Sequence, residues 1–321
     1  MKRLLAVLQL LLAGAAGAQE LPKSSLAVHT TSGWKTWWRS STAPAEWRNQ
    51  SLIIRDALRW NTILPGLDLA ELRLAGRGEA WRIRVIVVRL DPSVMHARLV
   101  KQTRDEGTLG AWAVDSARQP GIVAVNAGQF SDGTPWGWLI RNGVEESLPG
   151  IGPLSLALVA EVNRGARLIA VDSIERLRAD GRVVMAFQSY PTLIENGGIV
   201  PIALRSLNRG LDLRHRDSRV AIGELRDGRL LVVVTRFEGL GGVLSELPFG
   251  PTIPELAALM GALGCLEAVA LDGGISGQLM VRTPDGTRMW KGMRRVPLGL
   301  VFYPSADITS DSTTLSRFSP P

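Results

Sequence analysis

The sequence has 321 residues, of which 45% are apolar and 21% are charged, and its formal net charge is +7. This composition is ordinary for a folded globular protein and excludes a chain too polar to build a core. The basic balance favours anionic partners such as phosphate-bearing glycans, but no dense run of Lys and Arg occurs, so we expect no nucleic-acid partner.

The first 18 residues have the pattern of a secretory signal peptide. Lys2 and Arg3 precede a short apolar run, and residues 16–18 (Ala-Gly-Ala) form a small-x-small cleavage site. The apolar run is shorter than the roughly 20 residues that cross a bilayer, and no later segment is long and apolar enough. We therefore expect residues 1–18 to be removed, no transmembrane segment afterwards, and a periplasmic or secreted protein.

Cysteine and histidine are scarce in this chain. Cys265 is the single cysteine, so no intramolecular disulfide can form, and its apolar surroundings predict a buried, unreactive thiol. With only three histidines, the sequence offers little material for histidine-based metal sites or catalytic triads.

Residues 19–59 form a polar N-terminal extension that is rich in tryptophan. Tryptophans in a polar stretch can form a surface on which carbohydrate stacks. The alternative, which we favour, is a flap whose indole rings dock on the main domain. Residues 51–60 predict a short helix within the extension. Its tryptophans are Trp34, Trp37, Trp38 and Trp47.

The main domain is predicted over residues 60–305, where strand patterns recur. Residues 80–92 alternate and then run apolar to a Pro turn, which predicts a strand. Residues 95–100 can pair with that strand. Helical spacing follows over residues 106–119, and residues 121–130 predict a buried strand that breaks at an asparagine.

The second half of this domain predicts several paired strands. Asn-Gly and Asp-Gly dipeptides favour the tight turns of β-hairpins. The predicted units are a hairpin at 135–146 with an Asn142-Gly143 turn, paired strands at 153–170, a strand, loop, strand and turn at 183–200, and a hairpin at 219–236 with an Asp227-Gly228 turn.

The clearest helix is predicted over residues 252–265. Thr252 and Glu255 have the spacing of a capping box, and Pro254 lies in the first turn. A strand follows, and the Ser/Thr/Pro-rich tail at 306–321 predicts disorder. The whole pattern indicates an α+β protein: a single domain with a large mixed, mostly antiparallel sheet and a few packed helices.

Several predicted strands begin or end in a polar residue, often with glycine nearby. Such strand ends bring a side chain to an open edge of a sheet, and glycines there let a ligand or another backbone approach. The alternatives are a turn-forming Asn or Asp and a surface ion pair for the Arg. The residues are Asn126 with Gly128, Gln188 with Ser189, Arg219, and Asp272 with Gly273, Gly274 and Ser276.

These stretches, in this order, resemble the phosphodiester glycosidase family. The matching motifs are residues 126–130, residues 188–191, Arg219 before an Ala-x-Gly strand, and residues 271–276. The resemblance covers about residues 64–304 and implies a glycosidase that acts on phosphodiester-linked sugars. The sequence departs from the family pattern at Gln129, at Tyr190 and at residues 275–277, so the sugar does not carry over.

The resemblance implies roles for the same residues. Asp272 would be the main carboxylate, as nucleophile, base or electrostatic stabiliser, and Arg219 would hold the phosphate. Asn126 completes the catalytic set. Substrate would be bound by Gln188, Ser189, Gly128, Gly273, Gly274 and Ser276, with the two glycine N–H groups forming an anion nest.

A conventional two-acid glycosidase needs a second carboxylate. Asp132, Glu195, Asp217 and Glu224 are available, and the sequence does not choose among them. We expect no cofactor and no metal. A divalent cation shared by Asp272 and Asn126 is an alternative, although no acidic cluster with loop spacing supports it.

A different class of function is also open. The tryptophan-rich extension and the positive charge would suit a non-catalytic envelope protein that binds an anionic glycan. A polysaccharide-maturation factor that uses the same pocket is a third reading, in which a sugar instead of water accepts the cleaved group.

Overall fold

The computed structural model describes residues 23–77, 82–102, 112–117, 121–131, 134–152, 154–206, 210–239 and 247–305. The predicted signal peptide, the predicted disordered tail and most of the helix predicted at 106–119 lie outside these residues. The described end of that helix holds a short 3-10 turn, η3 (Val114–Ser116).

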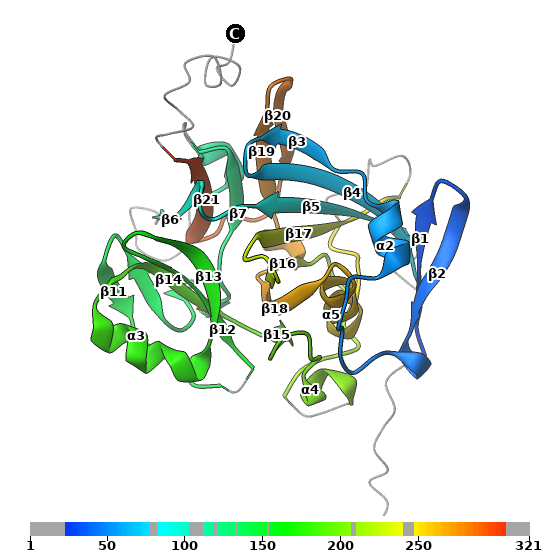
Figure 1. Ribbon diagram of the computed structural model, residues 1–321, viewed down its shortest axis with the longest axis horizontal. Coiled ribbons are helices and arrows are strands. Elements are labelled where there is room, and N and C mark those ends of the chain that lie inside the picture. The colour runs from blue at the N-terminus through cyan, green and yellow to red at the C-terminus, as the bar shows by residue number, and fades with distance from the viewer. Residues whose placement is uncertain are drawn as a thin grey trace, which may run out of the picture.

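A nine-stranded sheet is the largest element (Figure 1). Every described pair in it is antiparallel. Its strands, in spatial order, are β15 (Thr192–Ile194), β18 (Cys265–Leu271), β16 (Val220–Leu225), β17 (Leu230–Phe237), β5 (Ile83–Leu90), β4 (Leu67–Ala75), β1 (Ser25–Thr30) and β2 (Gly33–Arg39), and β3 (Asn61–Leu64) also pairs with β4.

Two five-stranded sheets and one short hairpin complete the β-structure. The first small sheet has the order β11 (Val144–Ser147), β10 (Leu139–Arg141), β14 (Val183–Ser189), β12 (Leu156–Glu161), β13 (Arg164–Ala170). The second has the order β20 (Gly286–Trp290), β19 (Leu279–Thr283), β7 (Val123–Asn126), β21 (Leu298–Pro304), β6 (Met95–Lys101). The hairpin consists of β8 (Phe130–Ser131) and β9 (Thr134–Pro135).

In the described residues, four short α-helices and four 3-10 turns accompany the sheets. Helix α5 (Ile253–Ala262) starts at the predicted capping box, in which the Thr252 side chain accepts from Glu255 N and the Glu255 side chain accepts from Thr252 N. The others are α2 (Leu52–Ala57), α3 (Ile174–Asp180), α4 (Ile202–Arg205), η1 (Ser40–Thr42), η3, η4 (Val171–Ser173) and η6 (Gly274–Ser276).

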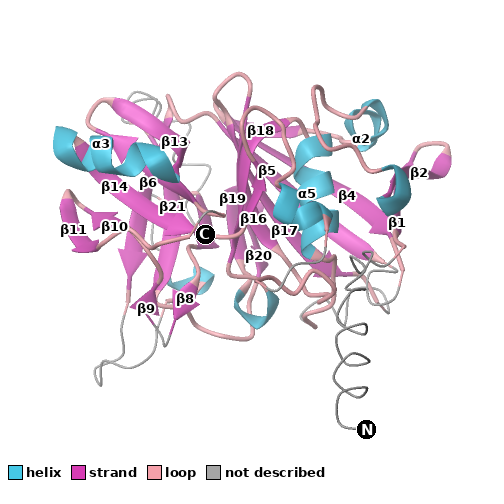
Figure 2. Cartoon of the chain, turned by 90° about the horizontal axis from the view of Figure 1, so that it is seen from below, coloured by secondary structure: helices cyan, strands magenta, loops and turns pink. Residues whose placement is uncertain are grey.

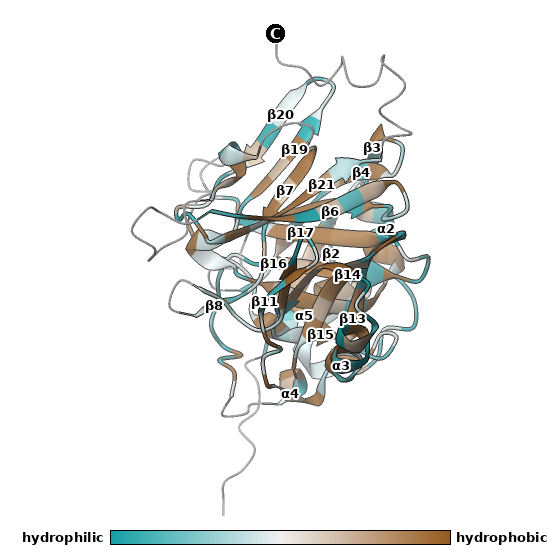
Figure 3. Cartoon of the chain, turned by 90° about the vertical axis from the view of Figure 1, so that its left-hand side faces the viewer, coloured by the Kyte–Doolittle hydropathy of each residue, from teal (hydrophilic) through white to brown (hydrophobic). Residues whose placement is uncertain are grey.

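The centre of the nine-stranded sheet, at β16 and β17, is buried on both faces. Figure 2 shows α5 on one face of this sheet, where it lies against β15 and β18. Val233 belongs to the core under α5, whereas its neighbour Val232 belongs to the core shared with the two small sheets. Both faces need apolar side chains, so β17 reads as a continuous apolar run instead of an alternating one. Figure 3 shows the same hydrophobic colouring along β7 and β19.

Most predicted elements are confirmed, and one pairing is wrong. The hairpins at 135–146, 153–170 and 219–236 form as predicted, with left-handed φ angles of 53° and 76° at Asn142 and Gly143. Residues 95–100 do not pair with the strand of 80–92. That strand, β5, has β4 on one edge and β17 on the other, so no edge is open, and β6 pairs with β21 in another sheet.

The described part of the N-terminal extension joins the main sheet, because β1 pairs with β4. Trp38 is 7% exposed and packs with Leu26 and with Ala258 of α5, whereas Trp34 stays 43% exposed. The extension therefore contributes to the fold as well as covering α5. The division at residue 59 stays a prediction.

Two acidic residues lie directly opposite each other on adjacent strands of the nine-stranded sheet. Glu267 of β18 is the register partner of Glu224 of β16, and like charges directly opposite are unfavourable. Burial raises the pKa of Glu267 to about 7; backbone N–H groups of Gly197 and Asn196 lower it, and the charges of Glu195 and Glu224 raise it. Cys265, on the same strand, is buried as predicted, and burial raises the pKa of its thiol.

We predict that Glu267 makes stability fall as the pH rises. The folded pKa of about 7 lies above the ordinary value of 4.5, so the native state binds the proton more tightly than the unfolded state. The contribution is complete below pH 4.5 and is lost as the pH rises through about 7. In urea titrations, Glu267→Gln should be more stable than the parent above pH 7 and remove this part of the pH dependence. An unchanged pH profile contradicts the prediction.

Candidate functional site

Asp272 stands at the end of β18, where the chain turns through η6. The two glycines after it are required by a second backbone segment, at residues 217–218. A Cβ on Gly273 would lie 2.5 Å from Ser218 O, and a Cβ on Gly274 would lie 2.6 Å from Asp217 Oδ2. Gly274 also has a φ of +58°, which disfavours other residues. The glycines therefore let two strand ends lie in direct contact.

Hydrogen bonds hold this contact together. Gly274 N donates to Ser218 O at 2.7 Å, and Ser218 Oγ donates to Gly274 O at 2.9 Å. Asp272 N donates to Gly128 O at 2.7 Å, which joins the same turn to the chain after β7. The ends of β7, β16 and β18 therefore meet at one place, and they bring Gly128, Gly273 and Gly274 together.

The Asp272 carboxylate lies among charged and polar neighbours. Burial is the largest cause that raises its pKa, and the nearby Asp217 carboxylate raises it further. A hydrogen bond from the Ser276 hydroxyl and the positive charge of Arg294 lower it. Arg294 is exposed, and its backbone N donates to Ile275 O at 3.0 Å, so it lies beside the turn. The sequence motifs did not include Arg294.

Asp217 is the second carboxylate of the site. Its Oδ1 accepts from Ser218 N at 2.8 Å, and its Oδ2 is 3.4 Å from His215 Nε2. Burial raises the pKa of Asp217, while Arg219, His215 and the Ser218 N–H lower it. Asp217 thus lies between the charges of Arg219 and Asp272.

The other three candidates for a second carboxylate do not share this position. Glu224 Oε2 accepts from Leu168 N of β13 at 2.7 Å. Glu195 lies in the turn after β15, where burial raises its pKa and the charge of Arg205 lowers it. Asp132 lies outside the described residues. Asp217 is therefore the candidate that the fold places next to Asp272.

Arg219 precedes β16, and the described residues engage its guanidinium through Nε and Nη2. Its Nε donates to Pro251 O at 3.0 Å and its Nη2 donates to His215 O at 2.6 Å. Among the residues that the structure describes, these carbonyls are its hydrogen-bond partners, and they occupy one edge of the group. The other edge, with Nη1, can still form a two-pronged contact with an oxyanion. Burial lowers the pKa of Arg219 and Asp217 raises it.

The Asn126 side chain holds the turn at residues 272–278 in place. It is fully buried; its Nδ2 donates to Asp272 O at 2.6 Å, and its Oδ1 accepts from Gln278 N at 2.9 Å. The amide thus connects both ends of the 272–278 turn. The structure places Asn126 at the predicted site, but its contacts suit positioning of Asp272 better than contact with a sugar.

The side-chain amide of Gln188 spends all of its hydrogen-bonding groups on neighbouring protein atoms. Its Oε1 accepts from Trp138 N and Gly150 N, and its Nε2 donates to Gly150 O and Ser155 Oγ. An amide has no further strong donor or acceptor. We therefore revise the predicted substrate contact of Gln188: it orders the 150 loop instead.

Ser189 is likewise buried. Its Oγ donates to Ala270 O of β18 at 2.7 Å. This bond joins β14 to β18 two residues before Asp272. Like Gln188, Ser189 supports the site through hydrogen bonds within the protein. Ser276, in contrast, hydrogen-bonds directly to the Asp272 carboxylate.

Two aromatic rings stand next to this turn, and sequence reasoning did not single them out as a pair. Trp136 and Tyr190 pack edge to face with ring centroids 4.6 Å apart. Gln129 Nε2 donates to Tyr190 O at 3.0 Å, and Trp136 N donates to Gln129 O at 2.8 Å. Gln129 and Tyr190, two of the positions at which the sequence departs from the family pattern, thus contact each other beside Gly128.

A comparison with family models decides the relationship. The phosphodiester glycosidase model matches residues 120–303, which is more than half of the chain and includes every site residue above. The chain belongs to the phosphodiester glycosidase family. It is therefore a member of a family of enzymes, as the ordered motifs predicted.

Solved structures show the same fold. This phosphodiester glycosidase is similar to the catalytic domain of zebrafish N-acetylglucosamine-1-phosphodiester alpha-N-acetylglucosaminidase, auto-inhibited by its pro-peptide, with a TM-score of 0.54 and 13% identity over 80% of this chain and 87% of that one. It is also similar to a hypothetical protein from Synechocystis, with a TM-score of 0.51 and 15% identity over 89% and 69% of the two chains. No curated protein matches in sequence.

Two further properties of this phosphodiester glycosidase concern metals and membranes. Within the described ranges, no group of three or more His, Cys, Asp or Glu side chains could hold a metal ion. The Asn126 amide also faces the backbone of Asp272, not its carboxylate. In the same part of the chain, no helix combines the length and apolar character needed to cross a bilayer.

We predict that Gly274→Ala destabilises this phosphodiester glycosidase more than a matched glycine change does. Gly181, with a φ of +68° and no atom within 4 Å of a built Cβ, is the control. Both substitutions place alanine in the left-handed region, at a cost of roughly 1–2 kcal/mol. Only Gly274→Ala also pushes on the Asp217 carboxylate. Urea unfolding measures the difference, and equal losses for the two variants contradict the contact.

Proposed function

We propose that this chain is an exported hydrolase that cleaves the glycosidic bond of a sugar-1-phosphodiester. The observation that carries the proposal is the row of charged groups at the ends of β16 and β18: Arg219, Asp217 and Asp272. A guanidinium with an open edge next to two carboxylates suits a substrate that joins a phosphate to an anomeric carbon.

In the proposed reaction, Arg219 holds the phosphate and Asp272 faces the anomeric carbon. The bond from the anomeric carbon to the phosphate oxygen breaks, and the electron pair stays on the phosphate. Positive charge that develops on the sugar is stabilised by the ionised Asp272. Water adds to the same carbon and gives its proton to a carboxylate.

A phosphate monoester is a good leaving group, so the second carboxylate need not act as a strong acid. Asp217 instead adjusts the charge of the site. Its negative charge opposes ionisation of Asp272 and is attracted to Arg219. Two adjacent carboxylates with different neighbours can divide the ionised and protonated states between them. The Ser276 hydroxyl orients the carboxylate of Asp272.

The aromatic pair beside the turn supports a sugar substrate. Trp136 and Tyr190 are partly exposed, and aromatic rings stack on the apolar faces of pyranoses. We propose that they contact the sugar while Arg219 holds the phosphate. The export proposal rests on the N-terminal sequence pattern, which predicts a periplasmic or secreted enzyme.

The direct test replaces Asp272 by Asn and assays hydrolysis of a panel of sugar-1-phosphodiesters. We expect kcat to fall by about 10²- to 10⁴-fold on any substrate that the parent cleaves, while the melting temperature shows that the variant folds. Asp285→Asn, an exposed aspartate in the β19–β20 turn, is the matched control. Full activity of Asp272→Asn removes it from the mechanism.

The pH profile tests the electrostatic arrangement. Burial and Asp217 raise the pKa of Asp272, so activity should fall, as the pH drops, through a value above the ordinary 3.8. Asp217→Asn removes a negative neighbour and should move this acid limb to lower pH. Arg294→Gln removes a positive neighbour and should move it to higher pH. Shifts of the opposite signs contradict the assignment.

A further inference from the structure

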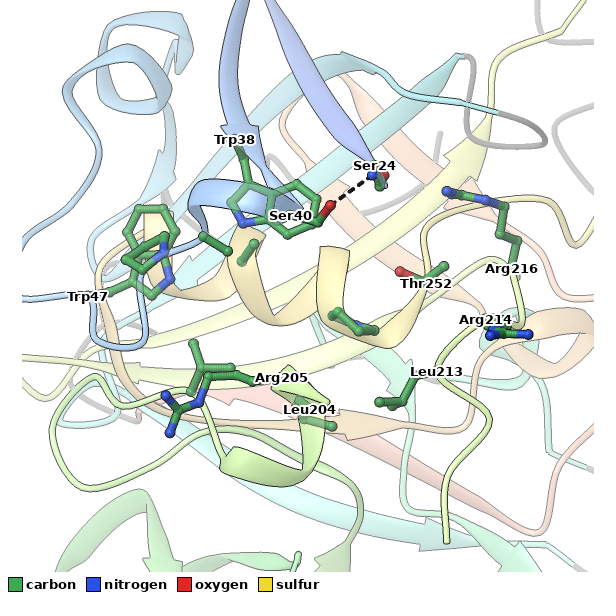
Figure 4. Close-up of a pocket in the computed structure, with 15 residues that line it drawn as sticks. Ser24, Trp38, Ser40, Trp47, Leu204, Arg205, Leu213, Arg214, Arg216 and Thr252 are labelled. Atoms are coloured by element: carbon green, nitrogen blue, oxygen red, sulfur yellow. Dashed lines mark hydrogen bonds between the residues drawn. The ribbon is translucent and has the colours of Figure 1, made fainter. Parts of the chain in front are cut away.

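A cavity of about 200 Å³ lies apart from the Asp272 turn, between the N-terminal extension and the main domain (Figure 4). Helix α5 lines it with Pro254 and Ala258. Trp38 and Trp47 come from the extension. Leu204 of α4 closes one of the remaining sides, and Leu213, Arg214 and Arg216 close the other. The extension thus completes a second concave site in this molecule.

The walls of this cavity are mainly apolar. Trp38 is held in place by Leu26 and Ala258, and the Trp47 indole lies directly on Gly261 of α5. A Cβ on Gly261 would overlap that ring, so glycine permits the position. Two indoles fixed on a helix give a rigid aromatic surface instead of mobile side chains.

The charged groups of the cavity are all cationic. Its described lining contains Arg205, Arg214 and Arg216 and no carboxylate. Arg216 is held by Glu255, with contacts of 2.7 and 2.8 Å, so its charge is compensated. Arg205 and Arg214 are exposed at the rim, and Figure 4 shows them on opposite sides of the cavity.

Two acidic groups lie near this rim. Glu195 feels the charge of Arg205, and Asp212 accepts a hydrogen bond from the backbone N–H of Arg214 at 3.0 Å. Neither carboxylate lines the cavity. Both guanidinium groups can therefore turn toward an anion at its mouth.

We propose that this cavity is a binding site for a single sugar ring that carries an anionic group, a phosphate or a carboxylate. Indole faces pack on the apolar face of a pyranose, while Arg205 and Arg214 pair with the anion. The volume of about 200 Å³ is below the roughly 300–1,000 Å³ of pockets for drug-sized ligands. It leaves room for one ring.

The cavity and the candidate active site share one wall. Leu213, Arg214 and Arg216 line the cavity, whereas the carbonyl oxygens of His215, within the same segment, and of Pro251 hold the Arg219 guanidinium. A ligand at Arg214 would steady the segment that carries Asp217 and Arg219. The binding proposal itself does not depend on the catalytic role of Asp272, so the two can fail separately.

Binding can be measured by isothermal titration calorimetry with four probes on the full chain. We expect D-glucose 6-phosphate and D-glucuronate to bind saturably, and D-glucose to bind about tenfold more weakly, since it lacks a charge-assisted contact. Octanoate should show no saturable binding. Saturable binding of octanoate alone, or of none of the probes, overturns the proposal.

Variants locate the site. Arg205→Gln combined with Arg214→Gln should weaken glucose 6-phosphate binding by at least about tenfold, whereas the exposed Arg182→Gln should not. Ala258→Met fills the cavity floor and should abolish binding of both anionic sugars. Asp272→Asn should bind them as the parent does. Loss of binding in Asp272→Asn, or unchanged binding in the arginine double variant, assigns the ligand elsewhere and overturns the proposal.

Discussion

The candidate site depends on the close contact of two backbone segments. Residues 217–218 lie against Gly273 and Gly274, at a distance that leaves no room for a side chain. Reciprocal bonds between Ser218 and Gly274 fix the contact. Because strand β16 then begins where strand β18 ends, Asp217 and Asp272 are presented together. Without the two glycines, the carboxylates would sit on separated chain ends.

Bringing two carboxylates together is costly unless their charge is compensated. The fold places a cation on either flank: Arg219 beside Asp217, and Arg294 beside Asp272. Both carboxylates still have raised pKa values, since burial outweighs these partners. This balance would suit the proposed reaction, in which the ligand carries both positive character and negative charge. A glycosyl phosphodiester in its transition state has both.

Much of this structure could be predicted from local sequence, and the failures have physical causes. The capping box of Thr252 and the Asn142-Gly143 turn depend on neighbours a few residues away, so their chemistry is readable. The pairing of residues 95–100 depends on which edges of β5 are free, which distant strands decide. The hydrogen bonds that occupy the Gln188 amide and the position of Arg294 could not be predicted, because both depend on loops that the motifs do not include.

Strand β21, near the end of the chain, lies between β7 and β6 in its sheet. Strands β6 and β7 are synthesised much earlier and do not pair with each other. Both pair with β21, so this part of the sheet can form only after Leu298–Pro304 has been made. Contacts of such sequence separation form slowly, because a long loop must close first. During synthesis, a chain that lacks β21 would keep open strand edges and need protection from aggregation until β21 has been made.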